Sequence, residues 1–554
     1  MKRLLLLCLL LFWSLFQGLH AQQMENFEVL WQVQSFHGDT EAFGIALAGG
    51  DLNGDGYVDL VIGSGEYIVS EFTGCVYVFW GDPLGIYDSL TILSNPIDAL
   101  LGFGESLEVM DINGDGNEDL IVGDYMYYTG SWPPANMGRV YIYFGGVAFD
   151  TLPDLILDTP PPQSWWFGRS VANVGDVNGD GYEDLGVGAP GWPHAYPPIG
   201  KVYIYYGGPD LDDIPDVELV GFPDEQNFGL EIGGGEDVNG DGYDDVLVAS
   251  MGPEDGNIVP LGRIFVFFGG NPMDSLWDFT VASRWGRRFG TTGGVVALKN
   301  FTHWGYADVA AAAHGVVDTV VVFRGEEHLK PNPAVKFVEE QQTANEDYGY
   351  DLAASRVLNF SALSASNRDY DNYRGKVYFY VGGYSFDTTA DAFFEGQDSV
   401  AMLMGEVISP AGDITGNNID ELLVTNLVSY DPQRLPQQVW LITYTGTGIQ
   451  EPPVFPPTRQ RISIFPTVAK DFVNIVFTGI KQGPVGIFVY DATGRRIYTA
   501  RKEVMSHEGQ LTWHLVDKWG HRVPDGIYFL NILSGSRRVA MERVMVIKKS
   551  GGEP

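Results

Sequence analysis

A nine-residue acidic segment recurs four times along the first half of this 554-residue chain. The first copy, Asp51–Asp59, reads Asp-Leu-Asn-Gly-Asp-Gly-Tyr-Val-Asp, and the others occupy residues 111–119, 176–184 and 237–245. Each copy has a carboxylate or amide oxygen at positions one, three, five and nine, and a glycine at position six. Similarity at a regular spacing is typical of repeat proteins, so we expect a fold built from one unit used many times.

The repeating unit is larger than the acidic segment. A Phe-Gly pair, first seen at Phe43-Gly44, precedes each copy, and a short apolar run follows each copy directly. Every unit then has an alternating apolar segment such as Val140–Gly146 and ends in a fourth one such as Val217–Val220. Short β-rich runs bounded by Gly, Pro and Asp predict strands, and four strands per unit are typical of a propeller blade.

Three further units are recognisable although their acidic segments have changed; they begin at Phe289, Tyr348 and Gly405. Seven units then fill residues from about 27 to 446. Residues 27–33 precede the first Phe-Gly pair and have no unit of their own. We expect them to form the outer strand of the last blade, because this closes the ring and protects strand edges.

The order Phe-Gly, Asp-x-Asn-x-Asp-Gly-x-x-Asp-Leu and Gly-Ala-Pro resembles the FG-GAP repeat of integrin α-subunit propellers and related bacterial surface proteins. The resemblance implies that each loop joins the first two strands of a blade and binds Ca²⁺, a cation that takes oxygen ligands. The implied ligands are the side chains at positions one, three, five and nine and the carbonyl at position seven: Asp51, Asn53, Asp55, Tyr57 and Asp59; Asp111, Asn113, Asp115, Asn117 and Asp119; Asp176, Asn178, Asp180, Tyr182 and Asp184; Asp237, Asn239, Asp241, Tyr243 and Asp245.

The fifth and seventh units have degenerate loops. The fifth has Asn300 and Trp304 where oxygen-rich ligands are needed, so we expect no tight site there. The seventh keeps four oxygen-bearing side chains but lacks the glycine at position six, so we expect a weaker site; these residues are Asp413, Thr415, Asn417 and Glu421. The sixth unit lacks the loop.

Two other interpretations of the acidic loop fit its sequence less well. An EF-hand needs a glutamate at position twelve and a helix on each side, whereas position twelve here is Ile62, Val122, Val187 or Val248, in apolar runs. A merely acidic turn is the simpler alternative, because Asn-Gly and Asp-Gly favour turns. Four copies with one oxygen spacing favour Ca²⁺. The motif contains no histidine or general base, so we expect a structural ion whose binding stabilises the fold.

Charge is distributed unevenly along the chain. The formal net charge is −39, yet residues 458–554 carry 15 Lys and Arg against 8 Asp and Glu. The preceding part is therefore strongly acidic, which argues against nucleic acid as a partner because phosphates would be repelled.

The N-terminus predicts a secretory signal peptide at residues 1–21. Lys2-Arg3 is followed by the apolar stretch Leu4–Phe16 and a plausible cleavage end at Ala21. This stretch is short for a membrane span, and no second candidate span is present in the sequence. Only Cys75 would remain after cleavage, so the exported chain needs a stabiliser other than an intrachain disulfide, and Ca²⁺ fits that need.

We divide the remaining chain into a propeller at residues 22–446, a Pro-rich linker at 447–459 and a small β-sandwich at 460–549. The overall expectation is an all-β protein, a seven-bladed propeller followed by an immunoglobulin-like sandwich.

The last segment resembles the C-terminal sorting domain of type IX secretion. The residues that carry the resemblance are Phe465-Pro-Thr, Tyr490–Arg495, Asp525–Tyr528 and Val544–Lys548, although the usual Pro-Asn-Pro is degraded and the tail is long. Such a domain implies export through the type IX machinery to the outer surface of a Gram-negative cell, with the cargo released or attached. The alternative is an ordinary sandwich for binding or spacing.

Aromatic residues gather in the loops that should lie on the rim opposite the acidic loops. We expect Trp132, Trp165, Trp192 and Tyr196 to contribute to a recognition face, since exposed aromatics mark binding surfaces. Packing between blades is the alternative.

The functional expectation is a secreted or surface protein for adhesion or for recognition of a protein or glycan, without catalysis. The alternative is a propeller-based polysaccharide lyase or glycosidase, which would need carboxylates near the axis. The chain lacks Gly-x-Ser-x-Gly, His-Glu-x-x-His and phosphate-binding glycine motifs. A structural component of a surface layer is a third possibility.

Overall fold

The protein is described here by a computed structural model that divides into two units, Met1–Ile449 and Gln450–Pro554. Described are residues 27–445 and 461–546, apart from residues 37–40, 67–73, 84, 86, 97–101, 129–136, 161–164, 194–197, 223–225, 252–261, 285–288, 291–293, 303–305, 315–317, 339–347, 358–359, 369, 371–373, 384–387, 397–403, 427–436, 466–467, 470–472, 479–482, 492–494, 505–507, 517, 519–520 and 535–536. The expected signal peptide and linker lie outside the described residues.

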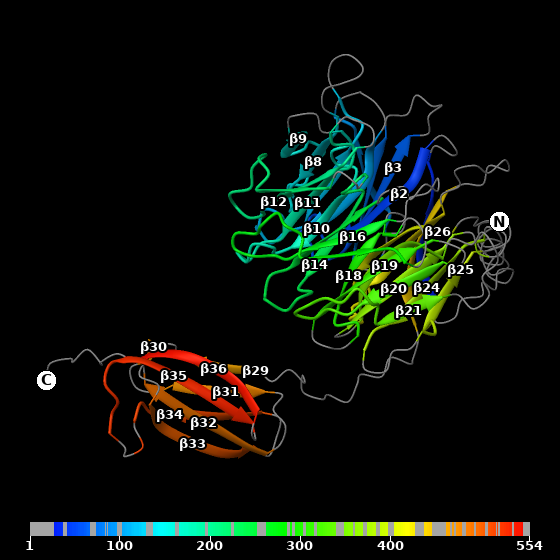
Figure 1. Ribbon diagram of the computed structural model, residues 1–554. Helices are drawn as coiled ribbons and strands as arrows, with labels where there is room; N and C mark the ends of the chain where they lie inside the picture. Colours follow the sequence, from blue (N-terminus) through cyan, green and yellow to red (C-terminus); the bar gives the residue numbers. More distant parts are fainter. Residues whose placement is uncertain are drawn as a thin grey trace. The chain divides into compact units, whose positions relative to one another are not determined.

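Seven four-stranded antiparallel sheets form the first unit (Figure 1). The first four blades are β2 (Glu41–Gly50), β3 (Asp59–Glu66), β4 (Cys75–Trp80) and β5 (Ser89–Ser94); β6 (Phe103–Met110), β7 (Asp119–Asp124), β8 (Arg139–Tyr143) and β9 (Leu155–Asp158); β10 (Val171–Gly175), β11 (Asp184–Ala189), β12 (Lys201–Tyr205) and β13 (Val217–Val220); β14 (Glu231–Glu236), β15 (Asp245–Ser250), β16 (Arg263–Phe267) and β17 (Phe279–Ala282).

The last three blades follow the same order. They are β18 (Val295–Lys299), β19 (Ala307–Ala313), β20 (Thr319–Phe323) and β21 (Val335–Val338); β22 (Tyr348–Val357), β23 (Phe360–Asn367), β24 (Lys376–Val381) and β25 (Ala392–Glu395); β26 (Met404–Gly412), β27 (Glu421–Asn426), β28 (Gln438–Tyr444) and β1 (Phe27–Gln34). The strand β1 pairs antiparallel with β28 from Phe27 opposite Tyr444 to Gln34 opposite Gln438. The predicted closure of the ring by the N-terminal strand is therefore confirmed.

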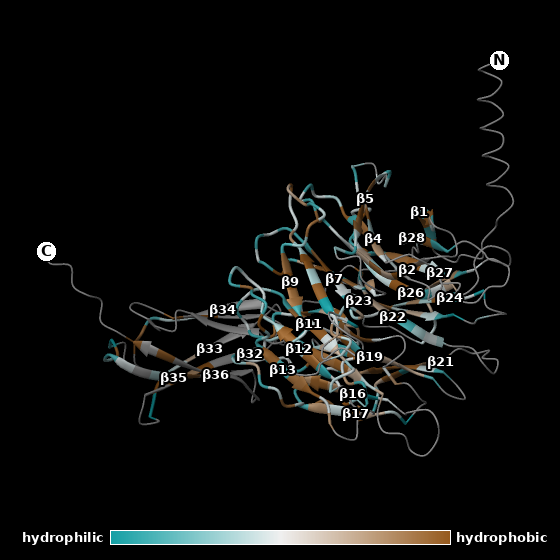
Figure 2. Cartoon of the chain, turned by 90° about the horizontal axis from the view of Figure 1, so that it is seen from above, coloured by the Kyte–Doolittle hydropathy of each residue, from teal (hydrophilic) through white to brown (hydrophobic). Residues whose placement is uncertain are grey.

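Apolar side chains fill the space between neighbouring blades. The middle strands β7, β11 and β15 are buried at every residue, which explains their nearly continuous apolar sequences. Figure 2 shows hydrophobic residues along the strands and hydrophilic ones in many connecting loops. The phenylalanine of each Phe-Gly pair anchors this packing: the rings of Phe103 and Tyr141 lie 5.6 Å apart, as do those of Phe167 and Tyr203.

The second unit has two sheets around one apolar core. A three-stranded sheet has the order β29 (Arg461–Phe465), β31 (Val473–Thr478) and β34 (Glu508–Trp513); the five-stranded sheet has the order β30 (Val468–Ala469), β36 (Arg537–Val546), β35 (Gly526–Ser534), β32 (Gly483–Asp491) and β33 (Arg496–Val504). Trp513 is fully buried in this core, beside Tyr528 at 5.6 Å between ring centroids. Two sheets sharing a core agree with the expected sandwich.

Candidate metal-binding loops and the central cavity

The acidic loops all lie on one rim of the propeller. Each connects the first strand of a blade to the second, as residues 51–58 connect β2 to β3. Strands, not helices, flank the loops, and the position-twelve residues lie inside β3, β7, β11 and β15. These four loops therefore lack the helices and the bidentate glutamate of an EF-hand.

The carboxylate at position nine anchors each loop to the blade. Asp59 is fully buried and accepts hydrogen bonds from the backbone N–H of Leu52 at 3.0 Å and of Gly81, after the third strand, at 2.8 Å. Asp184 makes the same pair of contacts with Val177 and Gly207. Burial raises the pKa of Asp59 and of Asp184 to about 7. Position nine thus has a structural role that the sequence pattern alone does not reveal.

The oxygens at positions one, three and five fold back over the loop. In the first loop, Asp51 accepts the N–H of Asp55 at 3.0 Å and of Gly56 at 2.7 Å. Asn53 accepts the N–H of Asp55, and Asp55 accepts that of Tyr57, each at 2.9 Å. Gly54 and Gly56 have φ of 71° and 88°, which permits this tight turn.

The same pattern recurs in the other three loops. Asp176 accepts the N–H of Asp180 and of Gly181, and Asp180 accepts that of Tyr182. Three oxygen-bearing side chains on one short backbone segment are the hard donors that Ca²⁺ takes. Among the described residues, no set of three or more His, Cys, Asp or Glu side chains is gathered to hold a metal as it stands.

The degenerate loops keep the anchor but change the rest. Asp308, at position nine of the fifth loop, accepts the N–H of Thr302 at 2.6 Å and of Gly325 at 3.0 Å. In the seventh loop, Asn418 replaces the glycine at position six and adopts φ of 63°, so the turn survives the substitution. There the hydroxyl of Thr415 donates to Glu421 at 3.0 Å, so two of the expected ligands are hydrogen-bonded to each other.

Two of the four aromatic residues expected on the recognition face are described. Trp165 precedes β10 and Trp192 follows β11, so both lie on the rim opposite the acidic loops. Both are half-buried, and the ammonium of Lys201 lies 4.4 Å from the ring centroid of Trp192. Trp132 and Tyr196 lie outside the described residues.

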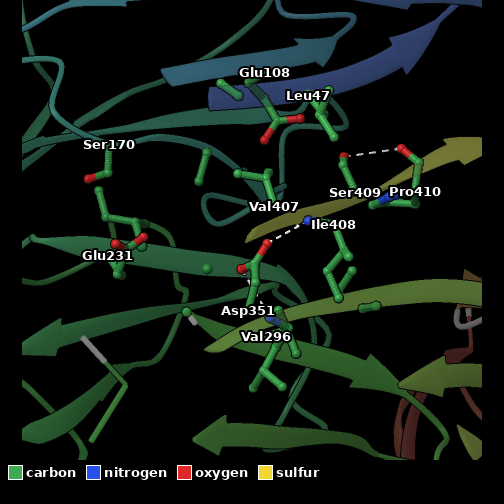
Figure 3. A pocket seen from close by; sticks show the side chains of 18 of the residues that line it. Leu47, Glu108, Ser170, Glu231, Val296, Asp351, Val407, Ile408, Ser409 and Pro410 are labelled. Atoms are coloured by element: carbon green, nitrogen blue, oxygen red, sulfur yellow. Dashed lines mark hydrogen bonds between the residues drawn. The ribbon is translucent and has the colours of Figure 1, made fainter. Parts of the chain in front are cut away.

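A cavity of about 1260 Å³ runs through the centre of the propeller, lined by the first strands of all seven blades. Besides Glu236 at the end of β14, five acidic side chains that are not in the loops line it: Glu105, Glu108, Glu231, Asp351 and Glu406. Figure 3 shows Glu108, Glu231 and Asp351 directed into this space from different blades. Sequence reasoning did not single out these residues, although they lie within four residues of a Phe-Gly, Tyr-Gly or Met-Gly pair.

The axial carboxylates have two kinds of surroundings. Glu108 accepts the N–H of Asn173 at 3.1 Å, and Asp351 accepts that of Ile408 at 2.7 Å, so each caps the free inner edge of the next blade (Figure 3). For Glu231, burial raises the pKa and the positive charge of Arg169 opposes this rise. Burial raises the pKa of Glu108 and Glu231 to about 7 and that of Asp351 to about 8.

Comparison with known protein families finds repeats in the first unit and a sorting domain in the second. FG-GAP repeats match residues 167–205 and 228–267, an FG-GAP-like repeat matches 51–122, and a secretion system C-terminal sorting domain matches 463–548. Such a sorting domain implies secretion or placement at the outer-membrane surface. Within the described residues, no helix is long and apolar enough to span a membrane.

Integrin α-subunits are among the relatives. The chain is 32% identical to integrin alpha-5 of Xenopus laevis over 241 residues, 41% of this chain and 21% of the integrin. It is 33% identical to integrin alpha-3 of Cricetulus griseus over 154 residues, 27% of this chain and 14% of the integrin. The matched part thus spans about a fifth or less of these relatives.

Among solved structures, PorZ of Porphyromonas gingivalis, a surface component of the type-IX secretion system, overlaps 88% of this chain and 58% of its own, at 13% identity and a TM-score of 0.37. That overlap is too loose to bear on the fold, which is defined by the order of strands in the seven sheets. The chain is an FG-GAP repeat β-propeller protein, similar in its repeats to integrin α-subunits, that carries a C-terminal sorting domain of the type IX secretion kind.

Proposed function

We propose that this protein is a non-catalytic recognition or adhesion propeller, exported by a Gram-negative bacterium and stabilised by about four Ca²⁺ ions. The observation that carries the proposal is the fourfold recurrence of one oxygen-rich loop with one backbone conformation on one rim. Each ion would be held by positions one, three, five and nine and by the carbonyl at position seven. It would offset repulsion among at least three carboxylates and fix the hairpin.

The absence of a disulfide among the described residues supports a metal in this role. Cys75 is buried in β4 and is not part of a disulfide. Exported proteins commonly gain stability from disulfides, and Ca²⁺ at four hairpins would supply a comparable constraint.

The recognition face is proposed on the rim opposite the loops. Trp165 and Trp192 are close there, because the N–H of Gly191 donates to the carbonyl of Trp165 at 3.1 Å. Half-buried aromatic rings beside a lysine offer a stacking surface for a sugar ring or an apolar side chain of a protein.

Glycan and extracellular-protein arrays probed with the mature chain test this face. We expect binding that is lost when Trp132, Trp165, Trp192 and Tyr196 are all changed to alanine while the melting curve is kept. Binding that survives all four substitutions would contradict the assignment. A matched control is Trp277→Ala, because Trp277 is 42% exposed in the loop between β16 and β17, on the other rim.

The sorting domain gives a separate expectation about partners. A chain ending at residue 459 should stay inside the outer membrane of a type IX-secreting host, whereas the full chain should reach the surface or the medium. Export of the truncated chain at the normal level would contradict the role of residues 460–549.

A second candidate function rests on the axial carboxylates. Acids with a pKa near neutrality, placed opposite one another in a large cavity, could serve as proton donor and base for a glycosidase or lyase. A panel of acidic and neutral polysaccharides tests it. Products that form with the native chain and vanish with Glu231→Gln or Asp351→Asn would favour the enzyme; no products with the native chain would favour recognition.

A further inference from the structure

The acidic loops contact one another in sequence around the rim. The backbone N–H of Asp51, position one of the first loop, donates to the carboxylate of Glu118, position eight of the second. The N–H of Asp176 donates in the same way to Asp244 at 3.0 Å, and the N–H of Asp244 returns a hydrogen bond to the carbonyl of Asp176 at 3.2 Å. In these two pairs of neighbouring loops, position eight of one loop therefore holds position one of the loop before it.

Position seven makes a second contact with the preceding loop. The ring of Tyr182 covers Gly114, position four of the second loop, so closely that a Cβ at that glycine would collide with it. The ring of Tyr243 covers Gly179 of the third loop in the same way. Glycine is needed at position four partly because the next blade occupies the space where a side chain would lie.

A third contact holds the carbonyl at position two. The second glycine after the third strand of each following blade donates its N–H at 2.7 Å: Gly146 to Leu52, Gly208 to Ile112 and Gly270 to Val177. Each of the first three loops is thus held by the blade that follows it. The residues that hold it lie between or beside the proposed metal ligands of that following blade.

The chain of contacts has two ends. Tyr57, at position seven of the first loop, is 40% exposed. A Cβ at Gly416, position four of the seventh loop, would meet nothing within 4 Å, so no described side chain of the first blade covers that glycine. Position eight of the first loop is Val58, whose side chain has no hydrogen-bond acceptor. After the fourth loop, position eight is Ala307, which contributes only its N–H, to the carbonyl of Asp237 at 3.0 Å. The linked set is therefore the first four loops.

We propose that the side chains at positions seven and eight are positioning residues for the metal loop of the preceding blade, so that Ca²⁺ binds the first four loops with positive cooperativity. An ion that orders positions seven and nine of one loop also fixes position eight between them. That residue then holds position one of the loop before it, so the second ion meets a loop that is already ordered. This inference rests on the proposed Ca²⁺ sites.

Calcium titration of the mature full chain tests the coupling, with bound ions counted by equilibrium dialysis. We expect a Hill coefficient clearly above 1 for the native chain, and a value near 1 for the double variant Tyr182→Ala and Tyr243→Ala. Both substitutions keep the backbone carbonyl that would bind the ion, so about four ions should still bind. Tyr57→Ala is the matched control, because Tyr57 occupies position seven of the first loop and its side chain covers no preceding metal loop, so this variant should keep the native Hill coefficient.

The outcomes separate the two proposals. Four independent ions in the native chain, or equal effects of Tyr57→Ala and the double variant, would overturn the coupling and leave the metal sites standing. No bound Ca²⁺ at all would overturn both. If the double variant does not fold, Glu118→Gln and Glu118→Ala decide the matter: the glutamine keeps an acceptor for the N–H of Asp51 and should keep cooperativity, and the alanine should lower it.

Discussion

The first four blades and the last three have the same kind of apolar packing between strands but differ in the loops on the acidic rim. Asp184 in the third blade and Asp308 in the fifth are both buried, and each accepts one backbone N–H from its own loop and one from a glycine two residues after the third strand of the blade. Yet the fifth loop has lost most surface oxygens, and in the sixth blade only residues 358–359 separate β22 from β23. The buried anchor is thus kept in the fifth blade, whose loop has its full length, whereas the oxygens at positions one, three and five are dispensable for that loop. Their retention in four loops points to a separate task.

The largest expected effect concerns the shared anchor. Asp184→Ala removes an acceptor from the N–H groups of Val177 and Gly207, and Asp308→Ala removes one from those of Thr302 and Gly325. The free energy of unfolding should fall by about 1–3 kcal/mol for each N–H left unpaired. In chelator the two losses should be similar, and in Ca²⁺ the loss should be larger for Asp184→Ala. Denaturant unfolding under both conditions measures this. An Asp308→Ala variant as stable as the native chain would remove the structural role of position nine.

Position five distinguishes the two groups of blades. With Ca²⁺ at 100 times its Kd, Asp180→Ala should lose about 2.7 kcal/mol, the stabilisation by one bound ion. In chelator it should lose well under half of this, because the hydrogen bonds that Asp180 accepts, from Tyr182 and Asn178, lie within its own exposed or half-buried loop. Asn417→Ala, at the same position of the seventh loop, serves as the comparison and should show little dependence on Ca²⁺. Equal Ca²⁺ dependence of the two variants would contradict the division between the groups.

A smaller effect is expected from pH at the axis. The pKa of Glu231 is raised to about 7 by burial, above the ordinary value of about 4.3, with Arg169 opposing the shift and Asp351 nearby. The folded state therefore holds an extra proton between about pH 4 and 7. The stability that Glu231 contributes at low pH is lost as the pH rises through its pKa in the folded state. Glu231→Gln should flatten the decline between pH 5 and 8 by about 1–2 kcal/mol, since water in the cavity reduces the effect.

Thermal unfolding at saturating Ca²⁺ across that range measures the pH effect, with the loop carboxylates held ionised by the metal. Glu406, another charged group that lines the cavity, receives hydrogen bonds from Tyr350 at 3.1 Å and Arg368 at 3.4 Å. A Glu231→Gln profile parallel to that of the native chain would show that Glu231 is ionised throughout.

Much of the fold was predictable from the sequence because local patterns determine it. The Phe-Gly pairs and alternating strands repeat often enough to count seven blades. Residues 27–33 could be placed because they have no unit of their own and the last blade needs an outer strand. The second role of position nine was not predictable, because Gly81 lies 22 residues from Asp59 and only the folded blade brings them together. The axial carboxylates were missed for a similar reason: Glu108 meets Asn173 across 65 residues of sequence.

The most direct test of the account is a count of Ca²⁺ ions bound to the mature chain, combined with thermal unfolding before and after excess chelator. The account predicts about four tightly bound ions and a melting temperature that falls by more than about 10 °C when they are removed. A chain that binds no Ca²⁺ and melts identically in chelator would contradict it.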